Sequence, residues 1–360
     1  SGVSYKTLGE AVDFLEKLRK EGAKTRVYSS LNPCGLDLEK WAEMPVAKSL
    51  YEAQLRIIDL YSAMGLDPTL TCTPYYLKDV QGSTHLAWSE SSAISYANSL
   101  LGARTNREGG PSALAAALVG KTPRYGLHLD ENRKGDYLVD VQAPLLGGAS
   151  DYGALGVLVG RSVKMRVPVF SGLKEGPRDW LKSLGAAMAA SGAVALYHII
   201  GVTPEWPLKS GSGGQLWREG KPEETVKVDG RQLEDAYSNL TTSPIDVPDL
   251  AFVGCPHCSI SEMEEVARLI EGKKVKGGRR FWLCTSRHVK ALAEKGGLIT
   301  RLEAAGVEVY CDTCIIVTWL KEAGVDSIIT NSGKAAYYAP QFCNVDVVFD
   351  RLPEIVRKVT

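Results

Sequence analysis

The residues with the clearest chemical potential in this 360-residue chain are its eight cysteines, four of which form two CxxC pairs. One pair is Cys255 and Cys258 in GCPHCS, and the other is Cys311 and Cys314 in CDTC. Two such pairs suggest a four-cysteine zinc site, but compact zinc modules separate their pairs by roughly 15 to 20 residues. Here 52 residues separate the pairs, so the spacing argues against a zinc ribbon.

Three other uses of these thiols stay open. A thioredoxin-like redox site fits GCPHC, because this motif is predicted between a strand and a helix whose N-terminus would lower a thiol pKa. An iron-sulfur cluster fits cysteines on separate loops, since parallel strands gather distant loops at their carboxyl ends. Three thiolates would leave one iron without a protein ligand, free to act as a Lewis acid on a hydroxyl group. The commonest alternative is that the cysteines are buried core residues.

Three polar segments contain groups that bind anions: residues 88–92 (WSESS), 105–112 (TNREGGPS) and 330–334 (TNSGK). The first two open predicted helices, and the third ends a predicted strand. A helix N-terminus offers free backbone N–H groups to a phosphate or carboxylate. Ordinary capping by Ser91 and Ser112 explains the first two segments equally well.

Several classes of site receive little support. The five histidines form no HxH or HxxxH pair, which argues against a metal held by histidines. No GxSxG motif marks a nucleophilic serine, and TNSGK lacks the first glycine and the spacing of a phosphate-binding P-loop.

Hydrophobic periodicity predicts alternating helices and strands. Helices are expected at 8–20, 47–64, 91–101 and 261–270, the last with a capping box formed by Ser259 and Glu262. Strands are expected at 26–28, 249–253, 280–284, 307–310, 327–330 and 345–349. This alternation predicts an α/β fold with parallel sheets covered by helices. The Gly- and Ala-rich segment 143–160 predicts tight helix packing, with a ligand-facing loop as the alternative.

The domain organisation follows from a change in composition after Val202, where Pro, Gly, Ser and charged residues dominate up to Pro248. Such a segment is typical of a surface excursion or a linker. We therefore predict an α/β lobe with substrate loops at 1–205, an excursion at 206–248 and a C-terminal α/β lobe with cluster-binding loops at 249–360.

Composition sets limits on partners and location. Hydrophobic residues make up 44% and charged residues 23%, as in ordinary globular proteins. Lys plus Arg and Asp plus Glu are both 42, so no global basic field attracts nucleic acid or a membrane, and an anionic ligand must be met by local cations. No secretory signal is present, which predicts a reducing cytoplasm, and the chain is expected to begin inside a longer one because it has no initiator Met.

The motifs together resemble the aconitase X family, large (catalytic) subunit, over essentially the whole chain. The resemblance rests on SGVSYKTLG at 1–9, LNPCGLD at 31–37, TCTPYY at 71–76, HLAWSESSA at 85–93 and GARTNREGGPSALAAALVG at 102–120. It continues with GCPHCS at 254–259, DTCIIV at 312–317 and TNSGKAAYY at 330–338. Eight motifs in the family's order are highly specific.

The resemblance implies an aconitase-like fold, with several parallel α/β lobes around a central cleft, and a dehydratase activity. We expect the chain to carry no swivelling domain, which favours the family's two-subunit archaeal branch over its fused branch. The implied reaction removes water from (R)-5-phosphomevalonate to give trans-anhydromevalonate 5-phosphate, in an archaeal mevalonate pathway. Dehydration of cis-3-hydroxy-L-proline is the alternative within the family, and a CxxC thiol-redox protein is the alternative outside it.

The resemblance also implies the site. Cys72, Cys255 and Cys314 would hold an iron-sulfur cluster, of the [4Fe-4S] type with one open iron, and Cys343 is the reserve ligand. The implied substrate contacts are Gly2, Val3, Ser4, Asn32, Pro33, Glu90 and Ser91. Lys334 and Arg107 are the expected cations for the phosphate or carboxylate. The catalytic base is expected to be a serine of a small swivelling subunit, which would make the enzyme a heterodimer.

Overall fold

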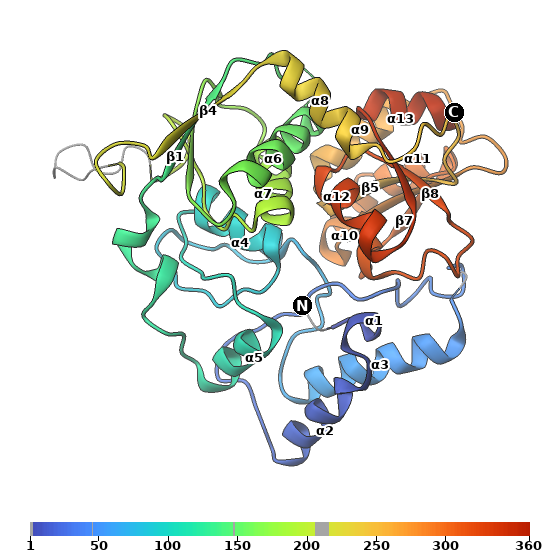
Figure 1. The fold of residues 1–360 in the computed structure, drawn as a ribbon. Coiled ribbons are helices and arrows are strands. Elements are labelled where there is room, and N and C mark those ends of the chain that lie inside the picture. Colours follow the sequence, from blue (N-terminus) through green and yellow to red (C-terminus); the bar gives the residue numbers. More distant parts are fainter. Residues whose placement is uncertain (1–2, 45, 147, 206–215) are drawn as a thin grey trace.

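The computed structural model describes residues 3–44, 46–146, 148–205 and 216–360 (Figure 1). Gly2, one of the implied substrate contacts, lies outside these ranges. The helices are α1 (Tyr5–Leu8), α2 (Val12–Lys20), α3 (Lys48–Ala63), α4 (Ser91–Leu100), α5 (Gly110–Val119), α6 (Ala149–Val163), α7 (Arg178–Gly192), α8 (Gly230–Leu240), α9 (Ile260–Ile270), α10 (Arg287–Lys295), α11 (Leu298–Ala304), α12 (Gly333–Phe342) and α13 (Leu352–Val359). None of the helices in the described ranges combines the length and apolar composition that a bilayer crossing requires.

The strands form two parallel sheets, which confirms the predicted α/β class. They are β1 (Tyr137–Val141), β2 (Pro168–Ser171), β3 (His198–Ile199), β4 (Glu224–Val228), β5 (Leu250–Cys258), β6 (Arg280–Thr285), β7 (Glu308–Tyr310), β8 (Ser327–Thr330) and β9 (Asp346–Phe349). The first sheet has the order β3-β2-β1-β4, and the second has the order β7-β6-β5-β8-β9. Every paired neighbour in both sheets is parallel.

The described residues before β1 form helices and loops and contribute no strand to either sheet. Figure 1 shows α1 to α3 and α5 grouped on one side of the molecule, away from both sheets. The prediction of a strand at 26–28 is wrong. The Arg26 N–H donates to Ala117 O in α5 (2.8 Å) and not to a neighbouring strand. Val27 and Tyr28 are 48% and 55% exposed, so no sheet covers them.

Most other predicted elements are present. Helices α3, α4 and α9 lie where periodicity places them, and Ser259 and Glu262 form the predicted capping box at the start of α9. Strand β8 has the predicted bounds, Ser327–Thr330. The predicted excursion 206–248 contains β4 and α8 in its described part, and β4 is the edge strand of the first sheet.

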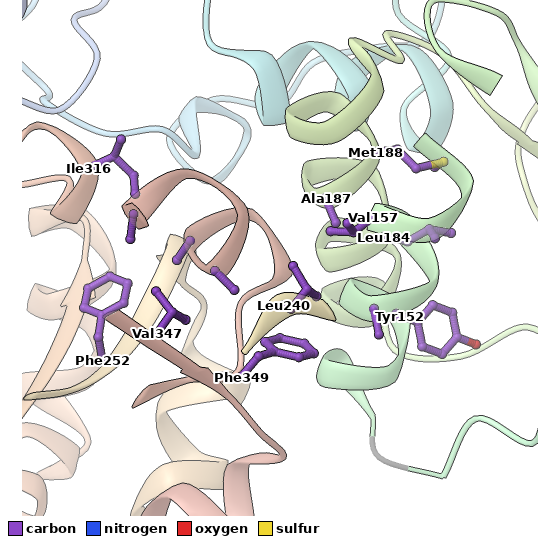
Figure 2. Close-up of a cluster of buried hydrophobic side chains, with 14 of the residues drawn as sticks. Tyr152, Val157, Leu184, Ala187, Met188, Leu240, Phe252, Ile316, Val347 and Phe349 are labelled. Atoms are coloured by element: carbon purple, nitrogen blue, oxygen red, sulfur yellow. The ribbon is translucent and has the colours of Figure 1, made fainter. Parts of the chain in front are cut away.

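One hydrophobic core joins the two sheets. Val157 in α6 and Leu184 in α7 belong to the same buried cluster as Phe252 in β5 and Phe349 in β9. Figure 2 shows Leu240 of α8 close to Phe349, between the helices of the first sheet and the strands of the second. Apolar burial therefore holds the two sheets in a fixed relation to each other.

The Gly- and Ala-rich segment forms α6, which packs closely on α7, so the predicted tight helix packing is confirmed. A Cβ atom at Gly156 would lie 2.6 Å from Leu184 O and 2.7 Å from the Cβ of Ala187. At Gly192, a Cβ would lie 2.0 Å from Gly160 O. The two helix backbones are in contact because these positions have no side chain.

We expect Gly156→Ala to destabilise the protein by about 1–3 kcal/mol, because the added methyl group must push α6 and α7 apart. Denaturant unfolding monitored by circular dichroism measures this change. Gly277→Ala is the matched control, since a Cβ there would meet no atom within 4 Å. An unfolding midpoint for Gly156→Ala equal to that of the control would contradict the close packing.

Candidate active site

The candidate site lies where the strand order of the second sheet changes direction. Strand β5 continues to β6 and β7 on one side, and β8 and β9 lie on its other side. In open parallel sheets, ligands bind beyond the carboxyl ends of the strands at such a point. Cys255 lies near the carboxyl end of β5, Cys314 follows β7, and Lys334 follows β8.

Cys72 reaches the same place from the N-terminal part of the chain. Its Sγ accepts a hydrogen bond from the backbone N–H of His257 (3.2 Å). The three cysteines are also close enough to interact electrostatically, because Cys314 contributes to raising the pKa of both Cys72 and Cys255. Cys72 is buried, whereas Cys255 and Cys314 are partly exposed. The structure thus brings together the three thiols expected to hold a cluster, although Cys72 lies 183 positions before Cys255 in the chain.

The environment of these thiols opposes the redox alternative. Desolvation raises the pKa of Cys255 to about 12, although the Lys334 ammonium opposes this shift. Burial also raises the pKa of Cys258 well above its usual value. A redox-active CxxC pair needs a lowered thiol pKa, so the shift has the opposite sign to the one that this function requires. All eight cysteines are free thiols.

His257 connects the loops that carry the three cysteines. Its Nε2 donates to Thr313 O (2.8 Å), next to Cys314, which leaves Nδ1 to accept a hydrogen bond from the Thr71 hydroxyl (3.1 Å). Burial lowers the pKa of this imidazole to about 4, so it is neutral at physiological pH. His257 is not among the residues predicted from sequence, although its place between the two cysteines of GCPHCS is a signal that marks it.

Glu90 and Lys334 form a buried ion pair beside the thiols. The Lys334 ammonium donates to Glu90 Oε1 and to the Ser92 hydroxyl (3.4 Å). Although burial alone would raise the pKa of Glu90, Lys334 holds it below the usual value. Glu90 also caps α4 by accepting from Ala93 N (2.7 Å). The pair therefore joins the N-terminus of α4 to that of α12.

Close backbone packing fixes the start of α12. Gly333, which precedes Lys334, lies against α6, and a Cβ at Gly333 would lie 2.6 Å from Gly153 O. A Cβ at Gly153 would in turn lie 3.0 Å from Gly333 N. Neither position has room for a side chain.

A cavity of about 940 Å³ adjoins this site. Val3, Asn32 and Glu90, three of the expected substrate contacts, line it. Val3 is held in place by Gln54, whose Nε2 donates to Val3 O (2.7 Å). The Asn32 turn is held by the Cys314 loop, because Cys314 N donates to Cys34 O (3.0 Å).

The other expected contacts have different surroundings. The Ser4 hydroxyl donates to Val317 O (3.4 Å), Pro33 is buried, and Ser91 donates to Glu90 Oε1 (3.4 Å). Arg107 does not line the cavity, and its guanidinium donates to Ala189 O (2.9 Å). The reserve ligand Cys343 donates its thiol to Ile316 O (3.4 Å).

The donor set fits an iron-sulfur cluster better than a single ion. Within the described ranges, no three His, Cys, Asp or Glu side chains are placed to share one metal ion. A cluster has a different requirement, because each thiolate binds a different iron. The Tyr75 hydroxyl is buried without a hydrogen-bond partner among the described residues. Burial raises its pKa well above the usual value, and the Cys72 and Glu90 charges add to this increase. This hydroxyl therefore keeps unused hydrogen-bonding capacity near Cys72 and Glu90.

A buried charge network lies behind the thiols. The Lys182 ammonium, in α7, donates to His257 O (3.2 Å) and pairs with Asp179 (3.2 Å) and Glu262. The Tyr76 hydroxyl donates to Asp179 (3.0 Å), which brings in the 3-10 helix Pro74–Tyr76 that follows Cys72. This single ammonium therefore joins α7 to the segment that follows Cys72 and to the segment that carries His257 and Glu262.

Comparison with known proteins identifies the family. Family models of the first, second and third aconitase X domains match residues 1–131, 135–238 and 248–360. The chain belongs to the aconitase X family. The crystal structure of Thermococcus kodakaraensis aconitase X (holo-form) is 41% identical, with a TM-score of 0.88 over 100% of this chain and 88% of that chain. This likeness confirms the aconitase-like fold expected from the sequence.

Relatives of this aconitase X chain have two kinds of name. The phosphomevalonate dehydratase large subunits of Methanocaldococcus jannaschii and Methanothermobacter thermautotrophicus are 44% and 47% identical over 99% of this chain, which covers 88% and 87% of those proteins. The cis-3-hydroxy-L-proline dehydratase of Pseudomonas aeruginosa is 36% identical over 93% of this chain, which covers 58% of that protein. Both kinds are dehydratases, and this aconitase X is a dehydratase.

We expect the stability of this aconitase X to depend on pH through Glu262. Burial raises the pKa of Glu262 to about 7, although the Lys182 ammonium opposes this increase. The Asp179 carboxylate adds to the increase, because it shares the same ammonium. The folded protein then keeps a proton that the unfolded chain releases near pH ~4.3. The free energy of unfolding should therefore fall between about pH 4.5 and 7, by on the order of 3 kcal/mol, and then level off.

Glu262→Gln should remove this part of the slope, which denaturant unfolding at a series of pH values measures. Glu264→Gln, on the exposed face of the same helix, is the control and should keep the slope of the native chain. An identical slope in both variants would rule out Glu262 as its source.

Proposed function

We propose that this chain is the large subunit of an enzyme that dehydrates (R)-5-phosphomevalonate to trans-anhydromevalonate 5-phosphate, in an archaeal mevalonate pathway. The observation that carries the proposal is the convergence of Cys72, Cys255 and Cys314 beside Glu90, which lines a cavity large enough for such a substrate. The names of the archaeal relatives support the choice of substrate.

Cys72, Cys255 and Cys314 are the residues that would hold an iron-sulfur cluster, of the [4Fe-4S] type. When bound through three thiolates, such a cluster supplies one open iron as a Lewis acid for the departing hydroxyl group. Other residues of this chain act on the three thiols and on the loops that carry them. Lys334 opposes the rise that burial causes in the pKa of Cys255 and Cys314, and so reduces the cost of forming the thiolates that bind metal. His257 fixes the three loops relative to one another.

The reaction breaks a C–O bond at the tertiary carbon and a C–H bond at C2. The hydroxyl group leaves as hydroxide and a base accepts the C2 proton, so that a C=C double bond forms and the hydroxide and the proton together make up one water. We propose that Gly2, Val3, Ser4, Asn32, Pro33, Glu90 and Ser91 contact the substrate, with Val3, Asn32 and Glu90 in the cavity wall. We assign the base to a serine of a small subunit, because the archaeal relatives are named large subunits.

Sequence identity separates the two dehydratases as candidates. The phosphomevalonate dehydratase large subunit of Methanocaldococcus jannaschii is 44% identical to this chain, whereas the cis-3-hydroxy-L-proline dehydratase of Pseudomonas aeruginosa is 36% identical. The higher identity favours phosphomevalonate as the substrate.

The test is an anaerobic assay of the chain, reconstituted with iron and sulfide and combined with its small partner. We expect turnover of phosphomevalonate and none of cis-3-hydroxy-L-proline. Cys72→Ser should lose visible absorbance, iron and activity together, because two thiolates cannot retain the cluster. Cys343→Ser is the matched control, since its thiol bonds backbone carbonyl groups, and it should keep its colour and iron. A brown, active Cys72→Ser protein, or turnover of hydroxyproline alone, would overturn the proposal.

A further inference from the structure

The cavity has a second polar region, formed by the segment that follows α5. Helix α5 ends at Val119, and Gly120 adopts the left-handed conformation that turns the chain. Lys121 and Arg124 then line the cavity, and both are exposed. Neither side chain has an ion pair or hydrogen-bond partner among the residues that the structure describes.

The other cations at the cavity and the candidate site are already engaged. Arg104 pairs with Asp130 and donates to His128 O (3.2 Å). Lys78 lies over the Tyr28 ring, 4.0 Å from its centroid. Lys334 pairs with Glu90. An incoming anion therefore finds its free positive charges at Lys121 and Arg124.

The carboxylates of the cavity do not cancel these two charges. Three acidic residues line it, and two of them, Glu90 and Asp130, are paired with cations. The third is Glu131. The described wall thus has an excess of positive charge, although the whole chain is neutral.

Local contacts position this segment. The Thr122 hydroxyl lies 3.5 Å from His128 Nε2, and His128 Nδ1 lies 2.8 Å from His85 Nδ1. Both histidines also line the cavity. Arg26 N donates to Ala117 O in the last turn of α5 (2.8 Å). The turn that carries the two cations is therefore held against the N-terminal loops.

We propose that Lys121 and Arg124 bind the phosphate group of the substrate and select phosphorylated hydroxy acids over unphosphorylated ones. This inference rests on the proposed function for the identity of the substrate. A guanidinium and an ammonium together match a phosphate dianion, the first by paired hydrogen bonds and the second as a point charge. The substrate then spans the cavity, with its phosphate at Lys121 and Arg124 and its hydroxy acid end at Glu90 and the thiols.

The test compares the reconstituted complex with and without the two cations. In the Lys121→Ala/Arg124→Ala variant, we expect KM for phosphomevalonate to rise roughly tenfold or more while kcat changes by less than about twofold, because the lost contacts do not involve the reacting atoms. The inhibition constant of inorganic phosphate should rise with KM. The matched control is Lys295→Ala/Arg231→Ala, which removes two exposed cations outside the cavity and should leave both constants unchanged.

Two further measurements separate the alternatives. Lys121→Arg with Arg124→Lys keeps both charges and should recover most of the lost affinity for phosphate. Calorimetric titration of inorganic phosphate into the complex tests the anion site independently of turnover. Phosphate binding without turnover of phosphomevalonate would overturn the proposed function and not the anion site. A double alanine variant with unchanged KM and unchanged phosphate affinity would overturn the assignment of Lys121 and Arg124.

Discussion

The Lys182 ammonium is almost fully buried where the three aconitase X domains meet. Asp179 and Glu262 surround it, and it donates to the backbone of His257 between the two cysteines of the CPHC segment. A buried charge is tolerated only when its partners are well placed, so each of these contacts constrains the others. Through Tyr76 the same network fixes the segment that carries Cys72. The position of the thiols therefore depends on a charge that does not itself face the cavity.

This network and the cavity wall have different roles. Behind the thiols, neutral His257 and the Lys182 network hold backbone segments in place. Beside them, Glu90 lines the cavity and pairs with Lys334, whose ammonium opposes the rise that burial causes in the pKa of Cys255. Cys255 and Cys314 are partly exposed, whereas Cys72 is buried. A group held by the thiols would be anchored through the Lys182 and His257 contacts and reached by substrate from the cavity.

Much of the fold could be predicted from sequence, because local patterns determine it. The strand Ser327–Thr330 and the cap at Ser259 depend on nearby residues, whereas the segment at 26–28 lacks a partner strand, which no local pattern reveals. The three cysteines were found through motifs, and their spacing alone left several uses open. Lys334 and Arg107 were expected to meet an anion because of their charge, but Lys334 pairs with a residue 244 positions away. Such pairing is decided by tertiary contacts.

The contact between Gly153 and Gly333 has a consequence for how this protein can change over evolutionary time. Gly153 lies in the range matched by the second aconitase X domain, and Gly333 in the range matched by the third. Their backbones touch immediately before the lysine that pairs with Glu90, which belongs to the first. A domain taken from a distant relative would have to reproduce this contact to within a few tenths of an ångström. Glycine at both positions is therefore a condition for exchanging the second or the third domain singly.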